Sequence, residues 1–462
     1  MSQSPEAPRD EAMDAEIVAE ARAEASIPAS RGSADDAIEA DQAPATTAEG
    51  TGSLWRDANF LRMWGGQAFS QFGAQITELA IPVLAVLILN ATEFEVGVLT
   101  ASGVAAFLLV GLPAGAWIDR MRKRHVMIVA DVVRAVALAA LPLLWWAGVL
   151  HMWHLYVVAL IMGVATVFFD VSYQSIVPSL VRPTQIAEAN GKFESTAQVA
   201  NIAGPAVGGW LVAVVTAPFA IVATVFTYIA SFIALSFTRD NEVVTPKHER
   251  APIMHEIGEG LRWVFGNRYL RRIVGCTGLS NFASNISFTL LPIFLLRELG
   301  FSPASLGLIF ALGSVGGLLG AMATPHIVRR LGEARAIPVS AIAFSVAGLF
   351  LPVAALVPSI ALPLLIVQMF IGSFMVLLYN ITQVTFRQRI TPPRLLGRMN
   401  ASIRFVVWGV MPIAALLAGV LGAWLGVTTT MWIGAFLGLA SALFVVTGPF
   451  WTLRELPTAD AR

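Results

Sequence analysis

The stretch that decides the fold is residues 95–124, which reads EVGVLTASGVAAFLLVGLPAGAWIDRMRKR. A continuous apolar run leads directly into a basic loop. About 20 apolar residues suffice for one helix to cross the hydrocarbon core of a bilayer, where only helices and closed barrels satisfy their backbone. Because the apolar residues are continuous and do not alternate with polar ones, a barrel is excluded. The run therefore predicts one membrane-spanning helix.

Eleven other segments have the same character. The twelve predicted spans are residues 60–89, 95–117, 126–149, 152–177, 193–215, 218–237, 273–296, 303–326, 336–357, 360–385, 403–424 and 428–450. The sequence therefore predicts an all-α membrane protein with twelve transmembrane helices.

The composition agrees with that fold class. Of the 462 residues, 56% are hydrophobic and 13% are charged, and the mean hydropathy is +0.71. Soluble proteins are about 25% charged, so we exclude a soluble enzyme, a secreted disulfide scaffold and a nucleic-acid binder. The single cysteine, Cys276, has no His or Cys neighbour at metal-ligand spacing. We expect it to be a buried apolar filler, and we predict no metal site.

The first residues differ from the rest of the chain. Residues 1–50 contain 12 acidic residues, 3 arginines and no aromatic residue. Such a segment buries too little apolar area to offset its ordering entropy, so residues 1–53 are predicted to be a disordered acidic cytoplasmic tail. We then expect a six-helix bundle at 54–240, a linker with an amphipathic segment at 241–270, a second six-helix bundle at 271–456 and a short tail at 457–462.

The basic residues predict the sidedness of the chain. Beyond residue 50, Lys and Arg gather at the loops that follow even-numbered spans, and only Arg297 lies near a loop on the opposite side. Basic loops stay in the cytoplasm. We therefore expect both termini to be cytoplasmic, in a bacterial inner membrane.

The two groups of six spans repeat one another. Displaced by 210 residues, Asp170 meets Asn380, Pro183 meets Pro393, Asn190 meets Asn400 and Gly209 meets Gly419. Displaced by 205 residues, the pair Gly111 and Gly115 meets Gly316 and Gly320. We interpret these matches as a duplication. Two such bundles can rock about a binding site near the bilayer midplane.

Three motifs carry a resemblance to a known family. The loop Gly115-Ala-Trp-Ile-Asp-Arg-Met-Arg-Lys-Arg124 resembles the G-x-x-x-D-R-x-G-R-K signature of the major facilitator superfamily, with Arg122 in place of the second glycine. Gly204-Pro205-Ala-Val-Gly208-Gly209 is similar to the G-P-x-x-G-G motif of the family's proton-driven exporters. Residues 256–265 (EIGEGLRWVF) resemble the linker of the subgroup containing macrolide-efflux proteins and siderophore (enterobactin) exporters. The resemblance implies two six-helix pseudo-repeat bundles.

The resemblance also assigns a role to the signature loop. It implies that Asp119 latches the two halves by facing the start of span eleven, where Arg404 is a further partner. The alternative is a basic loop that only sets topology. The residues concerned are Gly115, Asp119, Arg120, Arg122, Lys123 and Arg124.

A polar stripe lies inside the first span. Gln67, Gln71, Gln75 and Glu78 are spaced by four, four and three residues, so they share one helical face. A charge at the bilayer centre costs about 2.5–3.5 kcal/mol or more, so we expect this face to border the central cavity and to contact substrate or carry a proton. Interhelical hydrogen bonding within the bundle is the alternative.

Other polar residues inside the spans fall into two groups. Asp131 and Arg134 are predicted to form a structural pair, and Asp170 is a candidate for an inner gate, a packing contact or a proton site. In the second half, the candidates for cavity contacts are Asn281, Asn285 and Asn380, with interhelical hydrogen bonding again the alternative.

Together these features predict a secondary active transporter that uses alternating access. The favoured activity is proton-coupled efflux of an amphipathic small molecule, such as a macrolide-like drug or a siderophore. We expect no enzyme activity, no cofactor other than the proton gradient, and no partner besides the substrate and the lipid bilayer. The alternatives are an uptake symporter, a lipid translocator, or a non-transporting sensor or scaffold that uses the acidic tail.

Overall fold

The computed structural model describes residues 54–118, 121–182, 185–239, 253–392 and 395–451. Within these ranges, twelve helices are long and apolar enough to cross a membrane, as the sequence predicts. The predicted acidic tail lies outside the described residues, and so do residues 241–252 of the predicted linker and the short C-terminal tail.

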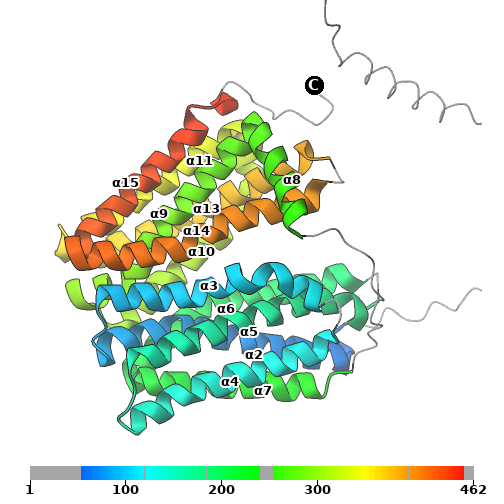
Figure 1. The fold of residues 1–462 in the computed structure, drawn as a ribbon, viewed down its shortest axis with the longest axis vertical. Helices are drawn as coiled ribbons and strands as arrows, with labels where there is room; N and C mark the ends of the chain where they lie inside the picture. The colour runs from blue at the N-terminus through cyan, green and yellow to red at the C-terminus, as the bar shows by residue number, and fades with distance from the viewer. Residues whose placement is uncertain (1–53, 119–120, 183–184, 240–252, 393–394, 452–462) are drawn as a thin grey trace, which may run out of the picture. The chain divides into compact units, whose positions relative to one another are not determined.

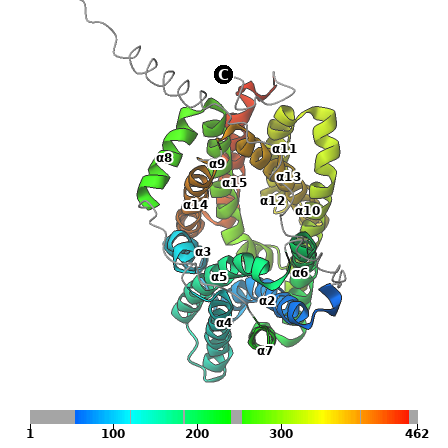
Figure 2. The same ribbon diagram turned by 90° about the vertical axis from the view of Figure 1, so that its right-hand side faces the viewer.

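The spanning helices form two bundles (Figure 1). The N-terminal bundle consists of α2 (Ala58–Val83), α3 (Glu93–Ile118), α4 (Lys123–Trp146), α5 (Met152–Leu180), α6 (Ile186–Val215) and α7 (Ala217–Ser236). The C-terminal bundle consists of α9 (Arg268–Ile293), α10 (Pro303–Leu331), α11 (Glu333–Gly348) with the short α12 (Phe350–Val353), α13 (Ala361–Ile390), α14 (Leu396–Leu425) and α15 (Val427–Val446). The helix α8 (Ile253–Gly266) precedes the second bundle and packs on α9 and α14 (Figure 2).

The two bundles pack their helices in the same way. In the first, α2 packs on α6 and α7, α4 packs on α5 and α7, and α3 packs on α5. In the second, α9 packs on α14 and α15, α11 packs on α13 and α15, and α10 packs on α13. Each contact in one bundle therefore has a counterpart in the other.

Local geometry repeats at a displacement of 210 residues. Asp57 caps α2 by accepting hydrogen bonds from the backbone N–H of residues 59 and 60, and Asn267 caps α9 in the same way from residues 269 and 270. Both helices end in a π-helix, Leu84–Ile88 (η2) and Phe294–Glu298 (η4). The loops that follow turn through residues of positive φ, Asn90 and Gly300. The predicted duplication is therefore present in the backbone.

The match at 205 residues is wrong. Helices α3 and α10 begin at Glu93 and Pro303, which are 210 residues apart, so Gly111 and Gly115 correspond to Ala321 and Pro325. The two glycine pairs lie at different depths in their helices, and their identical spacing reflects the frequency of small residues in membrane helices.

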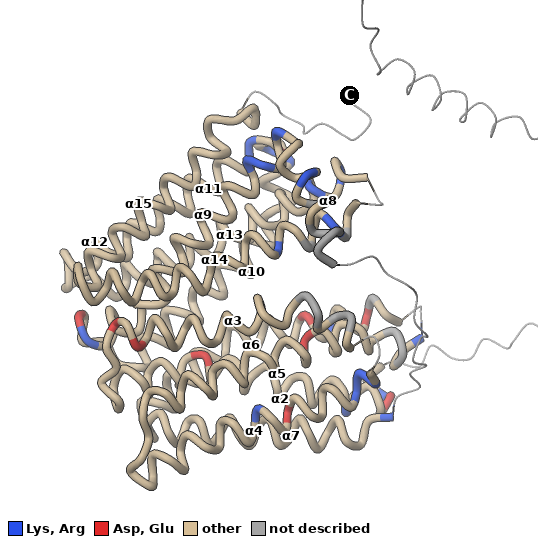
Figure 3. The backbone as a smooth tube through the Cα atoms, viewed as in Figure 1, with Lys and Arg blue, Asp and Glu red and all other residues tan. Residues whose placement is uncertain are grey.

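Charge distinguishes the two ends of the helices. Figure 3 shows that Lys and Arg gather at one end, where α3 ends and α4 begins. We call this the basic end. We call the opposite end, where η2 and η4 lie, the π-helix end.

Candidate functional site

The two bundles contact each other through two glycine crossings at the π-helix end. Where α3 crosses α14, a Cβ on Gly97 would lie 2.9 Å from Cα of Gly419. Where α6 crosses α10, a Cβ on Gly209 would lie 2.9 Å from Cα of Gly307. These distances are shorter than any normal Cβ contact, so only glycine allows the backbones to approach this closely. The two crossings correspond to each other at the displacement of 210 residues.

Arg297 adds a polar contact between the bundles at the same end. Its guanidinium donates to the carbonyl oxygen of Ala91 at 2.6 Å and to that of Val86 at 2.8 Å. Arg297 lies in η4 of the second bundle, and Val86 lies in η2 of the first. The π-helix end is therefore held by two glycine crossings and one arginine.

The glycine motif of the fifth span makes contacts within the N-terminal bundle and also contacts between the two bundles. A Cβ on Gly204 would meet Gln75, and one on Gly208 would lie 3.3 Å from Cα of Ile76, so both glycines admit α2 of the same bundle. Gly209 faces α10 of the other bundle. The motif, which includes Pro205, thus places α6 between α2 and α10.

The signature loop is only partly described. Asp119 and Arg120 lie outside the described residues, so the latch they were predicted to form stays a prediction. Gly115 lies in the last turn of α3, and Arg122 and Lys123 stand at the start of α4. Arg124 donates to the carbonyl oxygens of Leu235 and Ser236, where it satisfies the C-terminus of α7.

The polar stripe of α2 divides into a packed part and an exposed part. Gln67 is buried, and its Oε1 has no partner among the described atoms. Gln71 is partly buried, and Gln75 donates to Oδ1 of Asn201 on α6 at 2.9 Å. Glu78 has a solvent-accessible side chain and no hydrogen bond or ion pair within the described part of the chain. Gln75 therefore fits the alternative of interhelical hydrogen bonding. Glu78 is the acid of the stripe that has no partner among the described residues.

A buried ion pair lies between α4 and its neighbours. Arg134 pairs with Asp131 at 2.9 Å, and Ser231 of α7 donates to the same carboxylate at 2.6 Å. The guanidinium lies over the ring of Phe169 at 4.1 Å and over that of Tyr228 at 4.8 Å. Both charged side chains are at most 2% exposed, so this is the structural pair expected from the sequence.

Asp170 follows Phe169 on α5 and is partly buried. It lies within electrostatic range of Arg134 and makes no hydrogen bond that the described residues supply. Among the described residues of the N-terminal bundle, the charged side chains in the middle of the spanning helices are Glu78, Asp131, Arg134 and Asp170.

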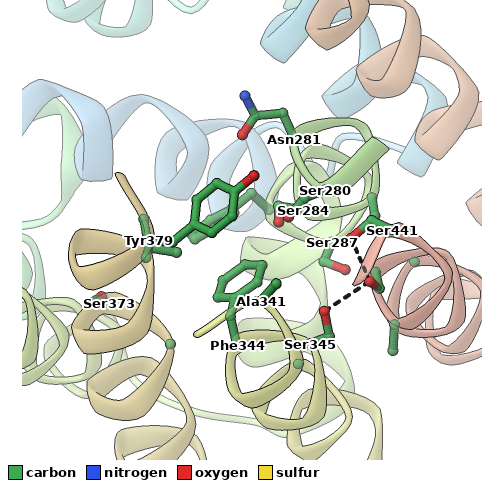
Figure 4. A pocket seen from close by; sticks show the side chains of 18 of the residues that line it. Ser280, Asn281, Ser284, Ser287, Ala341, Phe344, Ser345, Ser373, Tyr379 and Ser441 are labelled. Carbon is green, nitrogen blue, oxygen red and sulfur yellow. Dashed lines mark hydrogen bonds between the residues drawn. The ribbon is translucent and has the colours of Figure 1, made fainter. Parts of the chain in front are cut away.

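The C-terminal bundle contains a cavity of about 340 Å³ between α9, α11, α13 and α15 (Figure 4). Its polar lining includes Asn281 and Asn380, which the sequence predicts for the central cavity between the bundles and not for a cavity within one bundle. Asn285 is not part of the lining, and its Oδ1 is buried without a partner in the described chain. Hydroxyl groups supply most of the remaining polar lining: Thr277, Ser280, Ser284, Ser287, Ser340, Ser345, Ser373, Tyr379 and Ser441. None of the described residues that line the cavity is charged.

The sequence reasoning missed these hydroxyl residues. Serine is common in membrane helices and does not by itself indicate a binding site, and the sequence predicts Cys276 only as an apolar filler. Cys276 is buried, but it also lines the cavity. The available signal was the spacing of Ser280, Ser284 and Ser287 along one face of the seventh span.

The comparisons with known proteins agree with this architecture. The sequence model of the Major Facilitator Superfamily matches residues 63–413 and 273–461. The chain is 27% identical over 410 residues to the multidrug efflux pump Tap of Mycolicibacterium fortuitum. This alignment covers 84% of this chain and 94% of the relative. It is 23% identical over 376 residues to macrolide efflux protein A of Streptococcus pyogenes, covering 80% and 90%.

A solved structure supports the fold independently. The crystal structure of a bacterial homologue of the iron transporter ferroportin, in an inward-facing state, aligns with a TM-score of 0.68 and 17% identity, covering 87% of this chain and all of that one. At this identity the likeness shows the fold alone. The relatives are membrane transporters, and they confirm the resemblance to the macrolide-efflux subgroup. The chain therefore belongs to the Major Facilitator Superfamily and is a multi-pass bacterial membrane transporter, not an enzyme.

Proposed function

We propose that the protein exports an amphipathic small molecule from the cytoplasm in exchange for protons, by alternating access. The observation that carries the proposal is the pair of equivalent glycine crossings that join the bundles near the π-helix end of α3, α6, α10 and α14. Repeated halves that meet at such a seam can rock about it. The efflux relatives named above favour export over uptake.

The sidedness follows from charge. If the basic end faces the cytoplasm, the π-helix end is outside the cell. The glycine crossings then lie on the outer side, which supports the assignment of an inward-facing state. In Figure 1 the ribbons of α3 and α14 lie closest at the π-helix end.

Glu78 is the residue we assign to proton coupling. It is an exposed acid inside a spanning helix without a protein partner in the described chain. Since a lone charge at this depth is costly, the side chain is stable there only if it takes up a proton or meets water in a cavity. Alternation between these two situations couples proton movement to the motion of the bundles.

Transport in proteoliposomes tests the proposal. Erythromycin, a macrolide, is the probe, and an imposed pH gradient is the driving force. We expect erythromycin to move against the direction of proton flow and to stop moving when an ionophore collapses the gradient. Movement in the same direction as the protons would establish symport and overturn export. Transfer of a fluorescent lipid between leaflets, without erythromycin transport, would establish lipid translocation.

Labelling in whole cells tests the sidedness. In a Cys276→Ala background, the thiol introduced by His151→Cys should react with a membrane-impermeant maleimide, and the thiol introduced by Arg329→Cys should not. The reverse pattern would place the basic end outside the cell and would contradict the inward-facing assignment.

A further inference from the structure

The cavity of the C-terminal bundle occupies the place that the buried ion pair fills in the N-terminal bundle. At the displacement of 210 residues, Asp131 corresponds to Ala341, Arg134 to Phe344, and Tyr228 to Gly438. All three residues of the second bundle line the cavity. A guanidinium, a carboxylate and a phenol ring thus fill the first bundle, and smaller or uncharged groups replace them in the second.

The glycines that line the cavity have room for a side chain. A Cβ on Gly438 would meet nothing within 4 Å. A Cβ on Gly372, which enters from α13, would have its nearest neighbour 3.8 Å away. The volume of about 340 Å³ falls in the lower part of the range of small-molecule pockets, about 300–1,000 Å³. Side chains therefore do not close the cavity.

The serines that line the cavity determine which hydrogen bonds a bound molecule can make. Ser345 and Ser441 both donate to the carbonyl oxygen of Gly438, at 2.9 and 2.6 Å, so their oxygens keep lone pairs that can accept. Ser280, Ser284 and Ser287 have no hydrogen-bond partner within the described chain and can donate or accept. Figure 4 shows these three on one helix, with Ser345 and Phe344 on the helix facing it.

The cavity does not suit an ion. A charged group would be desolvated there without a counter-charge, which is unfavourable, whereas a hydroxyl-bearing ring would exchange its water for the serines and amides. The rings of Phe344, Phe288 and Tyr379 supply an apolar surface for the face of such a ring.

We propose that this cavity is a subsite that binds a neutral, hydroxyl-bearing ring of the transported molecule, such as a glycosyl group. The proposal rests on the transport function proposed above, and it adds the class of group that the C-terminal bundle recognises.

Protection from labelling tests the chemistry of the subsite. The full chain carries Cys276→Ala and Ser284→Cys and is held in lipid nanodiscs. Three probes share one octyl chain and are used below their micelle-forming concentrations: octyl β-D-glucoside, octyltrimethylammonium and octyl sulfate. At twice its dissociation constant the glucoside should slow maleimide labelling about threefold, and the two charged probes should leave the rate unchanged. Equal protection by a charged probe, or none by the glucoside, would overturn the proposal.

Filling the cavity tests its location. Gly438→Tyr installs the residue that the first bundle has at the equivalent position, and Gly372→Leu fills the space from a second helix. Each should abolish protection by the glucoside. The control Leu443→Tyr places the same ring on an exposed position of α15 and should preserve protection. Size-exclusion profiles identify variants that fail to fold. Protection that survives in either folded filled variant would place binding elsewhere.

These assays measure binding and not transport, so the two proposals fail separately. Protection without erythromycin transport in the wild type would overturn proton-driven export and leave the subsite standing as a binding site. Erythromycin transport that is unchanged by Gly438→Tyr would overturn the subsite and leave export standing.

Discussion

The two bundles share one arrangement of helices but differ in what lies between them: a buried ion pair in the first and an uncharged cavity in the second. Around α4 the N-terminal bundle buries Arg134 against Asp131, Phe169 and Tyr228. Around α11 the C-terminal bundle has a neutral, hydroxyl-lined cavity at the same place. The helix contacts that hold each bundle are equivalent, so we expect the N-terminal scaffold to form without these charges. We infer a division of tasks in transport, in which Glu78 of the first bundle couples protons and the cavity of the second bundle binds a neutral group.

Breaking the ion pair should have the largest effect. Arg134→Ala leaves the buried carboxylate of Asp131 without its partner, and removing one member of a buried pair costs about 3–5 kcal/mol. We expect a strongly lowered melting temperature in detergent.

The second bundle supplies the control for this variant. The double substitution Asp131→Ala with Arg134→Phe copies Ala341 and Phe344, and a neutral replacement of a buried pair is often tolerated. A melting temperature much closer to the wild type is therefore expected. If the double variant is as unstable as Arg134→Ala, the N-terminal scaffold needs its charges and the comparison fails.

Removing the arginine at the π-helix end should have the next largest effect. Arg297→Ala deletes two hydrogen bonds from a charged donor, a kind of bond worth about 1.5–3 kcal/mol. Water screens these two bonds and lowers their contribution, because Arg297 is exposed. Because these bonds join the bundles, their loss should favour separation of that end. Spin labels at the equivalent positions Phe94 and Ala304 should report an added population of longer distances.

The repeat again gives the matched control. Leu87 stands at the equivalent position of η2 and is exposed. Leu87→Ala should leave the distance distribution unchanged. An identical response of the two variants would mean that Arg297 does not hold the bundles together.

Neutralising Glu78 should have a smaller but specific effect. One pH unit corresponds to about 1.4 kcal/mol, or a tenfold accumulation per proton exchanged. Glu78→Gln should lose this gradient-driven accumulation and keep exchange of erythromycin at equilibrium. Glu194→Gln removes an exposed acid that bonds only Gln198 among the described residues, and it should transport like the wild type.

Deleting residues 1–53 should have the smallest effect. If the protein is a transporter whose cycle depends on the two bundles, erythromycin transport by the truncated chain remains unchanged. A complete loss of transport in a correctly inserted truncated protein would support the alternative in which the acidic tail is the functional element.

The sequence predicts the fold well because lipid imposes a simple rule. Every span needs a long apolar helix, so runs such as residues 126–149 are recognisable without any tertiary information. The repeat at 210 residues was also recognisable, since Gly209 and Gly419 are equivalent glycines with a packing role. The match at 205 was misleading because glycine spacing alone does not define depth in the membrane.

The cavity was harder to predict because it forms where the second bundle has smaller side chains than the first bundle has at the equivalent positions. Gly438 and Ala341 are unremarkable small residues until they are compared with Tyr228 and Asp131 in the folded halves. The polar stripe of α2 was recognised as one face, but only the structure separates Gln75, which bonds Asn201, from the unpartnered Glu78. The sequence therefore identified the polar residues inside the spans, and the packing of the helices decided which of them have a hydrogen-bond partner.

Erythromycin flux through Glu78→Gln and Gly438→Tyr, measured in the same proteoliposomes with and without a pH gradient, tests the division of tasks most directly. We predict that Glu78→Gln retains equilibrium exchange and loses only the response to the gradient, and that Gly438→Tyr loses both. Loss of exchange in Glu78→Gln together with normal driven transport in Gly438→Tyr would contradict the account.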